Sequence, residues 1–304
     1  MSTTSGTSVF NLDLNEIIEE AFERCGLEVR TGYEHRTARR SMNLMFTEWA
    51  NRGINLWTIE QGQISLTTAN IIYPLPVDTV DLIEQVVRTQ SGIPQTDINI
   101  SRISVDTYAT IPNKNAQGRP IQVWINRQTG QYNTTSVTLN GTINSSVTTI
   151  TVSSTANLPS AGFIKIDSET IAYSAVSGND LIYCVRGSNN TTAASHTTGA
   201  AITLQNLPSI NVWPAPDQDN YYTFVYWRLR RMQDAGSGSN VQDIPFRLIN
   251  CLVSGLAYYL SMKNPEAAQR MPQLKQMYDE QLMLALDEDR EKAPLRIAPR
   301  QLFY

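Results

Sequence analysis

Apolar positions in the first fifty residues recur with the 3.6-residue period of an amphipathic helix. From Leu14 onward they fall at i, i+3, i+4, i+7, i+8 and i+11, and Asp13 with Glu16 has the spacing of a capping box. A second segment, 33–52, repeats this spacing, and a glycine follows each segment in the C-cap position. The pattern predicts two adjacent helices, 13–25 and 33–52, joined by a short turn.

After residue 58 the period changes to two and β-branched residues become common. Residues 59–72 predict a pair of strands, 121–126 one short strand, and 210–213 and 221–229 two strands rich in aromatic residues. Segment 80–88 fits either a strand or a short helix, and the pattern leaves both open. This part of the chain is expected to form a β region.

The C-terminal part returns to helices. The run 246–262 is apolar nearly all round, which indicates burial on every side. A last helix is expected to begin near Pro265 or Pro272 and to extend to about Glu291.

The composition shifts between residues 134 and 206. Of these 73 residues, 32 are Ser, Thr or Asn and five are charged, and glycines separate four short apolar runs. The segment predicts a small all-β module, a barrel or a sandwich, inserted into a surface loop. Its expected strands are 149–152, 163–166, 170–175 and 181–185.

Together these elements predict an α+β fold, with a helical bundle made by the N- and C-terminal helix pairs, a β region between them and the inserted β module. Residues 1–9 are expected to be a flexible N-terminus, and 10–133 plus 207–291 the main domain. The module occupies 134–206. Residues 292–304 form a C-terminal tail with three basic residues and no acidic ones.

Charge argues against tight binding of nucleic acid. The chain carries 24 Lys and Arg against 28 Asp and Glu, a net charge of −4, whereas tight DNA binding needs a basic surface. This net charge is compatible with a channel through which DNA passes without being held. Residues 1–8 are rich in Ser and Thr and uncharged, so we expect that they are not a signal peptide. No run approaches the ~20 apolar residues of a membrane span. We expect synthesis in a cytoplasm, with the three cysteines as free, mostly buried thiols.

Few residues have the spacing of catalytic or metal sites. Neither His35 nor His196 lies in a local triad or zinc motif. Asp167 and Glu169 are two apart on a predicted strand, roughly 7 Å, which is compatible with the carboxylate pair of an inverting glycosidase. The favoured interpretation is that both belong with Lys165 to the solvated face of that strand.

Two arginine clusters are candidate contact sites. Arg36, Arg39 and Arg40 share one face of the second helix, and Arg228 and Arg230 end a strand. In an acidic chain, a solvated face or an intersubunit salt bridge is favoured over DNA contact. These five residues are therefore candidates for an intersubunit or channel surface.

Three passages, in order, resemble the head-to-tail adaptors of short-tailed phages, the tail tubular protein A type. The helix pair carries DLNEIIEEA (13–21) and RTARRSMNL (36–44), ending at WANRG (49–53). The β region carries IPNK (111–114), GRP (118–120) and the strand at Trp124. The third passage comprises VWPAPD (212–217), YWRLRR (226–231) and DAG (234–236). Within 134–206, the pattern Ile164-x-Ile166-Asp167-x-Glu169-x-Ile171-x-Tyr173, Cys184-x-Arg186-Gly187 and His196-x-x-Gly199 resembles small β domains of phage virion proteins.

The resemblance implies a structural virion protein of the tail or neck, assembled in the host cytoplasm. It implies a dodecameric ring between the portal and the tail nozzle, a central channel for DNA passage with transient contact to the genome, and no enzymatic activity, cofactor or membrane. Tail fibres are a further candidate partner. We expect the tail to dock on the portal through Arg296, Arg300, Leu302, Phe303 and Tyr304, because arginines and aromatic residues are common interface anchors.

Two alternatives stay open. A carbohydrate-binding or carbohydrate-cleaving tail protein would use the β module with Asp167 and Glu169, and another tail ring or terminator protein would share the ring architecture.

Overall fold

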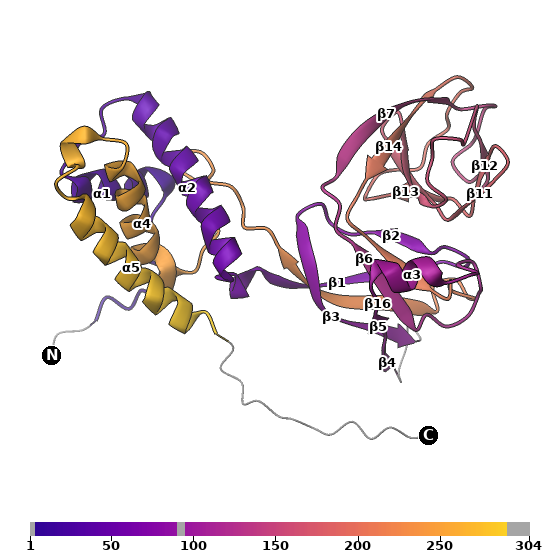
Figure 1. Cartoon of the computed structure of the whole chain (residues 1–304), viewed down its shortest axis with the longest axis horizontal. Helices are drawn as coiled ribbons and strands as arrows, with labels where there is room; N and C mark the ends of the chain where they lie inside the picture. The colour runs from indigo at the N-terminus through magenta and orange to yellow at the C-terminus, as the bar shows by residue number, and fades with distance from the viewer. Residues whose placement is uncertain (1–3, 90–94, 291–304) are drawn as a thin grey trace. The chain divides into compact units, whose positions relative to one another are not determined.

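The computed structural model describes residues 4–89 and 95–290. The chain divides into two compact units, a helical unit (Met1–Thr58 with Arg231–Tyr304) and a β unit (Ile59–Arg230). Figure 1 shows α1, α2, α4 and α5 in the first unit, and α3 together with the strands in the second. The predicted α+β class, with a helical bundle and a β region, is confirmed.

Four α-helices form the helical unit: α1 (Leu14–Cys25), α2 (Gly32–Arg52), α4 (Ile249–Ser261) and α5 (Met271–Glu288). Three short 3-10 turns adjoin them: η1 (Leu56–Thr58) follows α2, η2 (Phe246–Leu248) precedes α4, and η3 (Pro265–Ala267) connects α4 to α5. Helix α4 packs against each of the other three helices. Its all-round apolar sequence is explained by this central position, since residues on every face of α4 are buried.

The starts of α1 and α2 follow from local hydrogen bonding. The expected capping box is present: Glu16 N donates to Asp13 Oδ1 and Asp13 N donates to Glu16 Oε2, both at 2.9 Å. A second capping box starts α2, where Thr31 Oγ1 accepts from Glu34 N and Glu34 Oε2 accepts from Thr31 N. This second box was not predicted from the sequence.

The core of the helical unit is tightly packed around α4. Trp49 is fully buried and its Nε1 donates to the hydroxyl of Tyr278 at 3.1 Å. Gly255 lies where a Cβ would be 2.4 Å from Met45 Sδ, so α4 approaches α2 and α5 closely at this position. Burial of these large side chains supplies the main stabilisation, about 1.5–3 kcal/mol for each.

The β unit contains two four-stranded sheets outside the module. The first has the order β1 (Ile59–Ser65), β16 (Tyr222–Arg230), β3 (Thr79–Thr89), β4 (Thr96–Asn99). The second has the order β2 (Ile72–Pro74), β15 (Ser209–Trp213), β6 (Gln122–Asn126), β5 (Ser101–Arg102). Helix α3 (Val105–Thr110) follows β5. Of the two structures left open for segment 80–88, the strand is the one formed.

One strand prediction needs correction. The pair of strands predicted within 59–72 is not formed there: this segment contains β1 and only the first residue of β2, and the two strands belong to different sheets, β1 beside β16 and β2 beside β15. The turn at Ala69, with φ of 60°, separates them. Both partners lie more than 130 residues further along the chain, a separation that local pattern does not reveal.

The segment expected to be the β module forms two sheets, and neither is closed, so the barrel alternative is not found in the described residues. The orders are β13-β10-β9-β14-β7 and β11-β12-β8. The strands are β7 (Gln131–Thr138), β8 (Ile150–Thr151), β9 (Gly162–Ile166), β10 (Glu169–Tyr173), β11 (Ala175–Ser177), β12 (Asp180–Ile182), β13 (Val185–Ser188) and β14 (Ala201–Asn206). Ile150 and Leu181 of one sheet share a buried core with Ile164 and Ile171 of the other.

The module contacts the β region through a small second cluster. Ile71, Ile72 and Leu207 pack there with Phe163 of the module, and Ile71 N donates to Ser174 Oγ at 2.9 Å. The module therefore has its own core and a separate apolar seam. That residues 134–206 are an insertion in a parent domain remains a prediction.

Candidate assembly surfaces

Helix α2 presents the first arginine cluster to solvent. Arg36, Arg39 and Arg40 are exposed, and none of them has an ion-pair partner within 4–89 and 95–290. Their neighbour Lys263, whose Nζ donates to Ser41 Oγ at 2.6 Å, has a lowered pKa because of burial and the charge of Arg40. Uncompensated positive charge therefore accumulates on this side of the helical unit, as an anionic or acidic partner would require.

The second arginine cluster is engaged within the β unit. Arg228, of which only 11 % of the side chain is exposed, contacts Glu60 at 2.8 Å and Asp78 at 2.6 Å. Arg230 Nε contacts Glu60 at 2.6 Å. Burial acts to lower the pKa of Arg228, but its hydrogen bonds and ion pairs with Asp78 and Glu60 outweigh this and raise it. These ion pairs stabilise the contacts of β16 with its neighbours. That Arg228 and Arg230 also belong to an intersubunit or channel surface remains a prediction.

The expected portal-docking residues, Arg296, Arg300, Leu302, Phe303 and Tyr304, lie outside the described residues.

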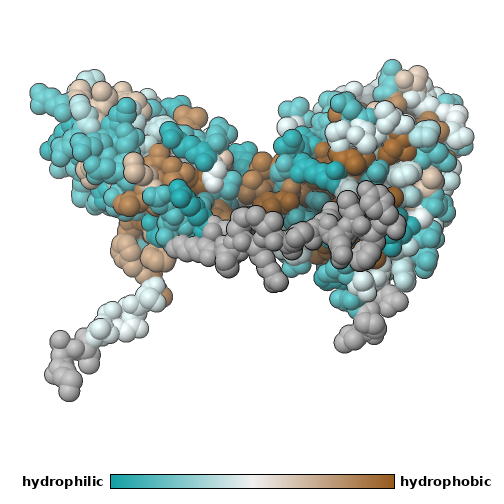
Figure 2. Space-filling model, turned by 60° about the horizontal axis from the view of Figure 1, so that its bottom comes forward, coloured by the Kyte–Doolittle hydropathy of each residue, from teal (hydrophilic) through white to brown (hydrophobic). Residues whose placement is uncertain are grey.

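A groove between α1 and α4 was not found from the sequence. It has a volume of about 660 Å³, and its apolar lining comes from Phe10, Leu12, Phe246, Ile249 and Val253. Phe10 and Phe246 are 74 % and 78 % exposed, which is unusual for large aromatic side chains without a partner. Figure 2 shows brown, hydrophobic patches among the hydrophilic surface of the helical unit. Its polar lining comes from Glu16, Glu19, Glu20 and Glu23 with Arg24 and Asn250.

The β module contains a buried ionic network around Glu169. Its side chain is fully buried, and Arg186 binds both carboxylate oxygens at 2.8 Å. His196 Nε2 contacts Glu169 Oε2 and His196 Nδ1 contacts Asp167 Oδ2, each at 2.8 Å. Each ring nitrogen of His196 therefore lies within hydrogen-bond distance of a carboxylate oxygen.

Backbone amides complete the network. Gly187 N and Ala194 N donate to the Glu169 carboxylate at 2.9 and 3.0 Å. Burial alone would raise the pKa of Glu169, but Arg186, these amides and His196 together lower it to about 2. The network therefore joins the two-residue turn after β9 to the strand β13 and the loop that follows it.

Two sequence interpretations are wrong here. Glu169 does not belong to a solvated face, and Asp167 is not on the same strand, since it is the first residue of the turn between β9 and β10 with φ of 53°. His196, which had no local motif, lies between the two carboxylates. The Asp-Ser pair between two apolar runs is a sequence signal for a hairpin, and the two-residue turn could have been predicted from it. The ion pairs come from residues distant in sequence and had no such signal.

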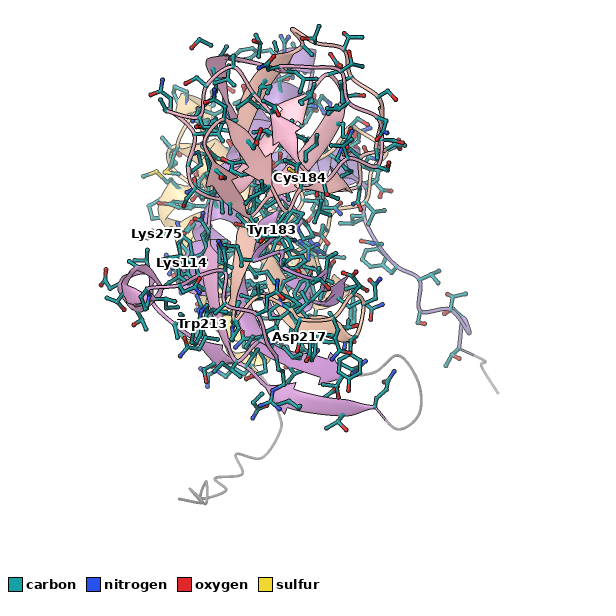
Figure 3. The ribbon with its side chains drawn as sticks, turned by 90° about the vertical axis from the view of Figure 1, so that its right-hand side faces the viewer. Lys114, Tyr183, Cys184, Trp213, Asp217 and Lys275 are labelled. Atoms are coloured by element: carbon teal, nitrogen blue, oxygen red, sulfur yellow. The ribbon has the colours of Figure 1, made fainter. Side chains whose placement is uncertain are left out.

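The three cysteines are free and buried, as expected. Burial raises the pKa of the Cys25 thiol to about 11 and those of Cys184 and Cys251 to about 12, which keeps them protonated and unreactive. Figure 3 shows Cys184 among the strands of the module. Within residues 4–89 and 95–290 no group of three His, Cys, Asp or Glu is placed to hold a metal ion. No helix in this described part is long and apolar enough to cross a membrane.

Comparison with known proteins identifies the family. A family model described as SU10 adaptor protein matches residues 100–298, well over half of the chain. The match contains two of the three passages that resemble phage adaptors, the second and third, whereas the opening helix pair precedes it. No curated protein matches the chain. The chain belongs to the SU10 adaptor protein family and is a member of the phage head-to-tail adaptors.

Proposed function

We propose that this protein assembles into a ring, dodecameric in the complete virion, that joins the portal to the tail nozzle and surrounds a channel through which DNA passes. The observation that carries the proposal is membership of the SU10 adaptor family, which gives a structural role in the phage particle and assembly with other head and tail proteins. We infer from the same membership that the protein is a virion component without enzymatic activity.

Charge on the helical unit supports assembly with protein partners. Arg36, Arg39 and Arg40 are exposed and unpaired among the described residues, while the groove between α1 and α4 carries uncovered aromatic side chains. Surfaces of this kind are common at protein interfaces. We propose the α2 arginines as an intersubunit surface and the tail residues from Arg296 to Tyr304 as the portal-docking segment.

The carbohydrate-cleaving alternative has little chemical support. A glycosidase pair needs two carboxylates that face an open cleft with room for the sugar and a water molecule. Here Glu169 is fully buried, and its carboxylate is occupied by Arg186, His196 and two backbone amides. The pair instead stabilises the module.

The test is the molar mass of the purified protein, alone and mixed with the portal of its phage, by multi-angle light scattering. A closed assembly of many copies in either sample is expected. A chain that stays monomeric with the portal present would contradict the adaptor ring. An open, indefinitely growing filament would show that the subunits associate but do not close.

A further inference from the structure

The groove between α1 and α4 has the composition of a site for a basic, apolar helix face. Five apolar side chains line it, and four glutamates, at 16, 19, 20 and 23, line it from α1, outside the buried face of that helix. Glu20 pairs with Arg24 at 2.8 Å and Glu16 caps its own helix. Glu19 and Glu23 have no ion-pair partner among the residues that the structure describes. Two carboxylates on the groove therefore remain available to cations.

Helix α2 carries a complementary surface. Tyr33, Arg36, Arg40 and Leu44 are spaced i, i+3, i+7 and i+11, which places them in one stripe along the helix. Tyr33 is 66 % and Leu44 57 % exposed, so that an apolar side chain stands at each end of the stripe with the two arginines between them. We call these four residues the α2 stripe.

The α2 stripe and the groove lie on different sides of the same unit. Arg24 of α1 contacts Asn250 and Ser254 of α4 beside the groove. On its other side α1 faces α2, where Asn15 and Ile18 lie beside Arg36 and Arg39. One chain therefore offers two different complementary surfaces, which is the condition for a head-to-tail contact between copies.

We propose that the α2 stripe of one copy docks in the α1–α4 groove of the next copy. Arg36 and Arg40 then face Glu19 and Glu23, while Tyr33 and Leu44 cover the exposed Phe10 and Phe246. An amphipathic helix face in an apolar groove is a common mode of recognition, and complementary charge fixes its register. The proposal rests on the proposed ring, for which it names the lateral interface.

Another candidate occupant of the groove is the C-terminal segment 292–304. This segment has three basic residues, no acidic ones, and several apolar side chains. The α2 stripe is preferred because its residues have defined positions on a rigid helix and two large apolar side chains uncovered. Docking of the segment is an outcome that the experiment separates.

The experiment uses charge reversal in the full-length chain. The first variant is Arg36→Glu with Arg40→Glu, and the second is Glu19→Lys with Glu23→Lys. The control, Lys275→Glu with Arg290→Glu, reverses one basic residue on α5 and one just after its C-cap, Asp289, and both lie outside the proposed contact. Molar mass is measured over a concentration series with portal present, and circular dichroism checks that each variant is folded.

We expect each reversal to raise the concentration at half assembly by roughly tenfold or more, and the control to leave it unchanged. Mixing the two reversed chains should restore assembly, because each reversed surface then meets the opposite charge. If both reversed variants assemble as readily as the wild type, the proposed interface is wrong, whereas the proposed ring is not contradicted. Loss of assembly in the Glu19→Lys, Glu23→Lys variant alone would assign the groove to the C-terminal segment. A wild-type chain that stays monomeric with the portal present would overturn both the interface and the ring.

Discussion

At the scale of single residues, Arg186 and His196 share the buried carboxylate of Glu169. Removing one partner of a buried ion pair leaves the other charge desolvated, which costs about 3–5 kcal/mol. The module has a small core and few charged residues, so this network is a large part of what fixes its loops. Asp167, whose side chain is 67 % exposed, contributes far less to the same network because water screens it.

We expect Glu169→Gln to lower the free energy of unfolding of the module by about 3 kcal/mol at neutral pH. Asp167→Asn is the matched control, since Asn tolerates the positive φ at this turn, and it should cost less than about 1 kcal/mol. Urea denaturation followed by near-ultraviolet circular dichroism measures both. Equal losses for the two variants would show that the buried pair is not the dominant contact.

The pH dependence follows from the depressed pKa of Glu169. Its folded-state pKa, about 2, lies below the ordinary value of 4.5. The contribution of the carboxylate is therefore complete above about pH 4.5 and is lost as the pH falls toward 2, at most about 3 kcal/mol. The stability difference between wild type and Glu169→Gln should shrink over this range, and a difference that stays constant down to pH 2.5 would contradict the assignment.

At the scale of elements, Gly255 sets the distance between α4 and its neighbours. A Cβ at this position would lie 2.4 Å from Met45 Sδ and 2.7 Å from Tyr278 Cε2, and both side chains are buried. Ala favours the helix by about 1 kcal/mol, but insertion of a methyl group into a packed core costs about 1–3 kcal/mol. Packing therefore decides the sign of the change in stability caused by Gly255→Ala.

We expect Gly255→Ala to destabilise the helical unit by about 1 kcal/mol, measured by thermal unfolding at 222 nm. Gly32→Ala, at the start of α2, is the control because a Cβ there meets no atom within 4 Å. It should be neutral or slightly stabilising. A stabilising Gly255→Ala would mean that α2 and α5 move apart to accept the methyl group.

Helices were more predictable from sequence than strand pairing. The apolar stripe and the capping residues of α1 lie within one segment, so a local pattern contains the whole signal. For β1, the partner β16 begins more than 150 residues later, and nothing in the local alternation of β1 identifies it. The same limit applies to the surfaces, because the α1–α4 groove joins Glu19 to Phe246, far apart in sequence.

At the scale of the whole molecule, the ends of the module lie close together. Gln131 of β7 is paired with Asn206 of β14, and Gly130 N donates to Asn206 O at 2.7 Å. A chain that leaves the β region at residue 130 therefore returns beside its point of departure. This arrangement supports the proposal that the module is an insertion, since its removal requires only a short turn.

Deletion of residues 134–206 should leave the helical unit folded and ring assembly intact, because the groove and the α2 stripe contain no residue of the module. The β unit should lose a few kcal/mol, since Ile71 and Ile72 lose their contact with Phe163. Phe163→Ala in the full chain is the control, because it removes the aromatic contact and keeps the module. Light scattering should show a ring lighter by one module per subunit. A deletion variant that loses its helical signal would show instead that the helices depend on the module to fold, and the division proposed for the chain would then be wrong.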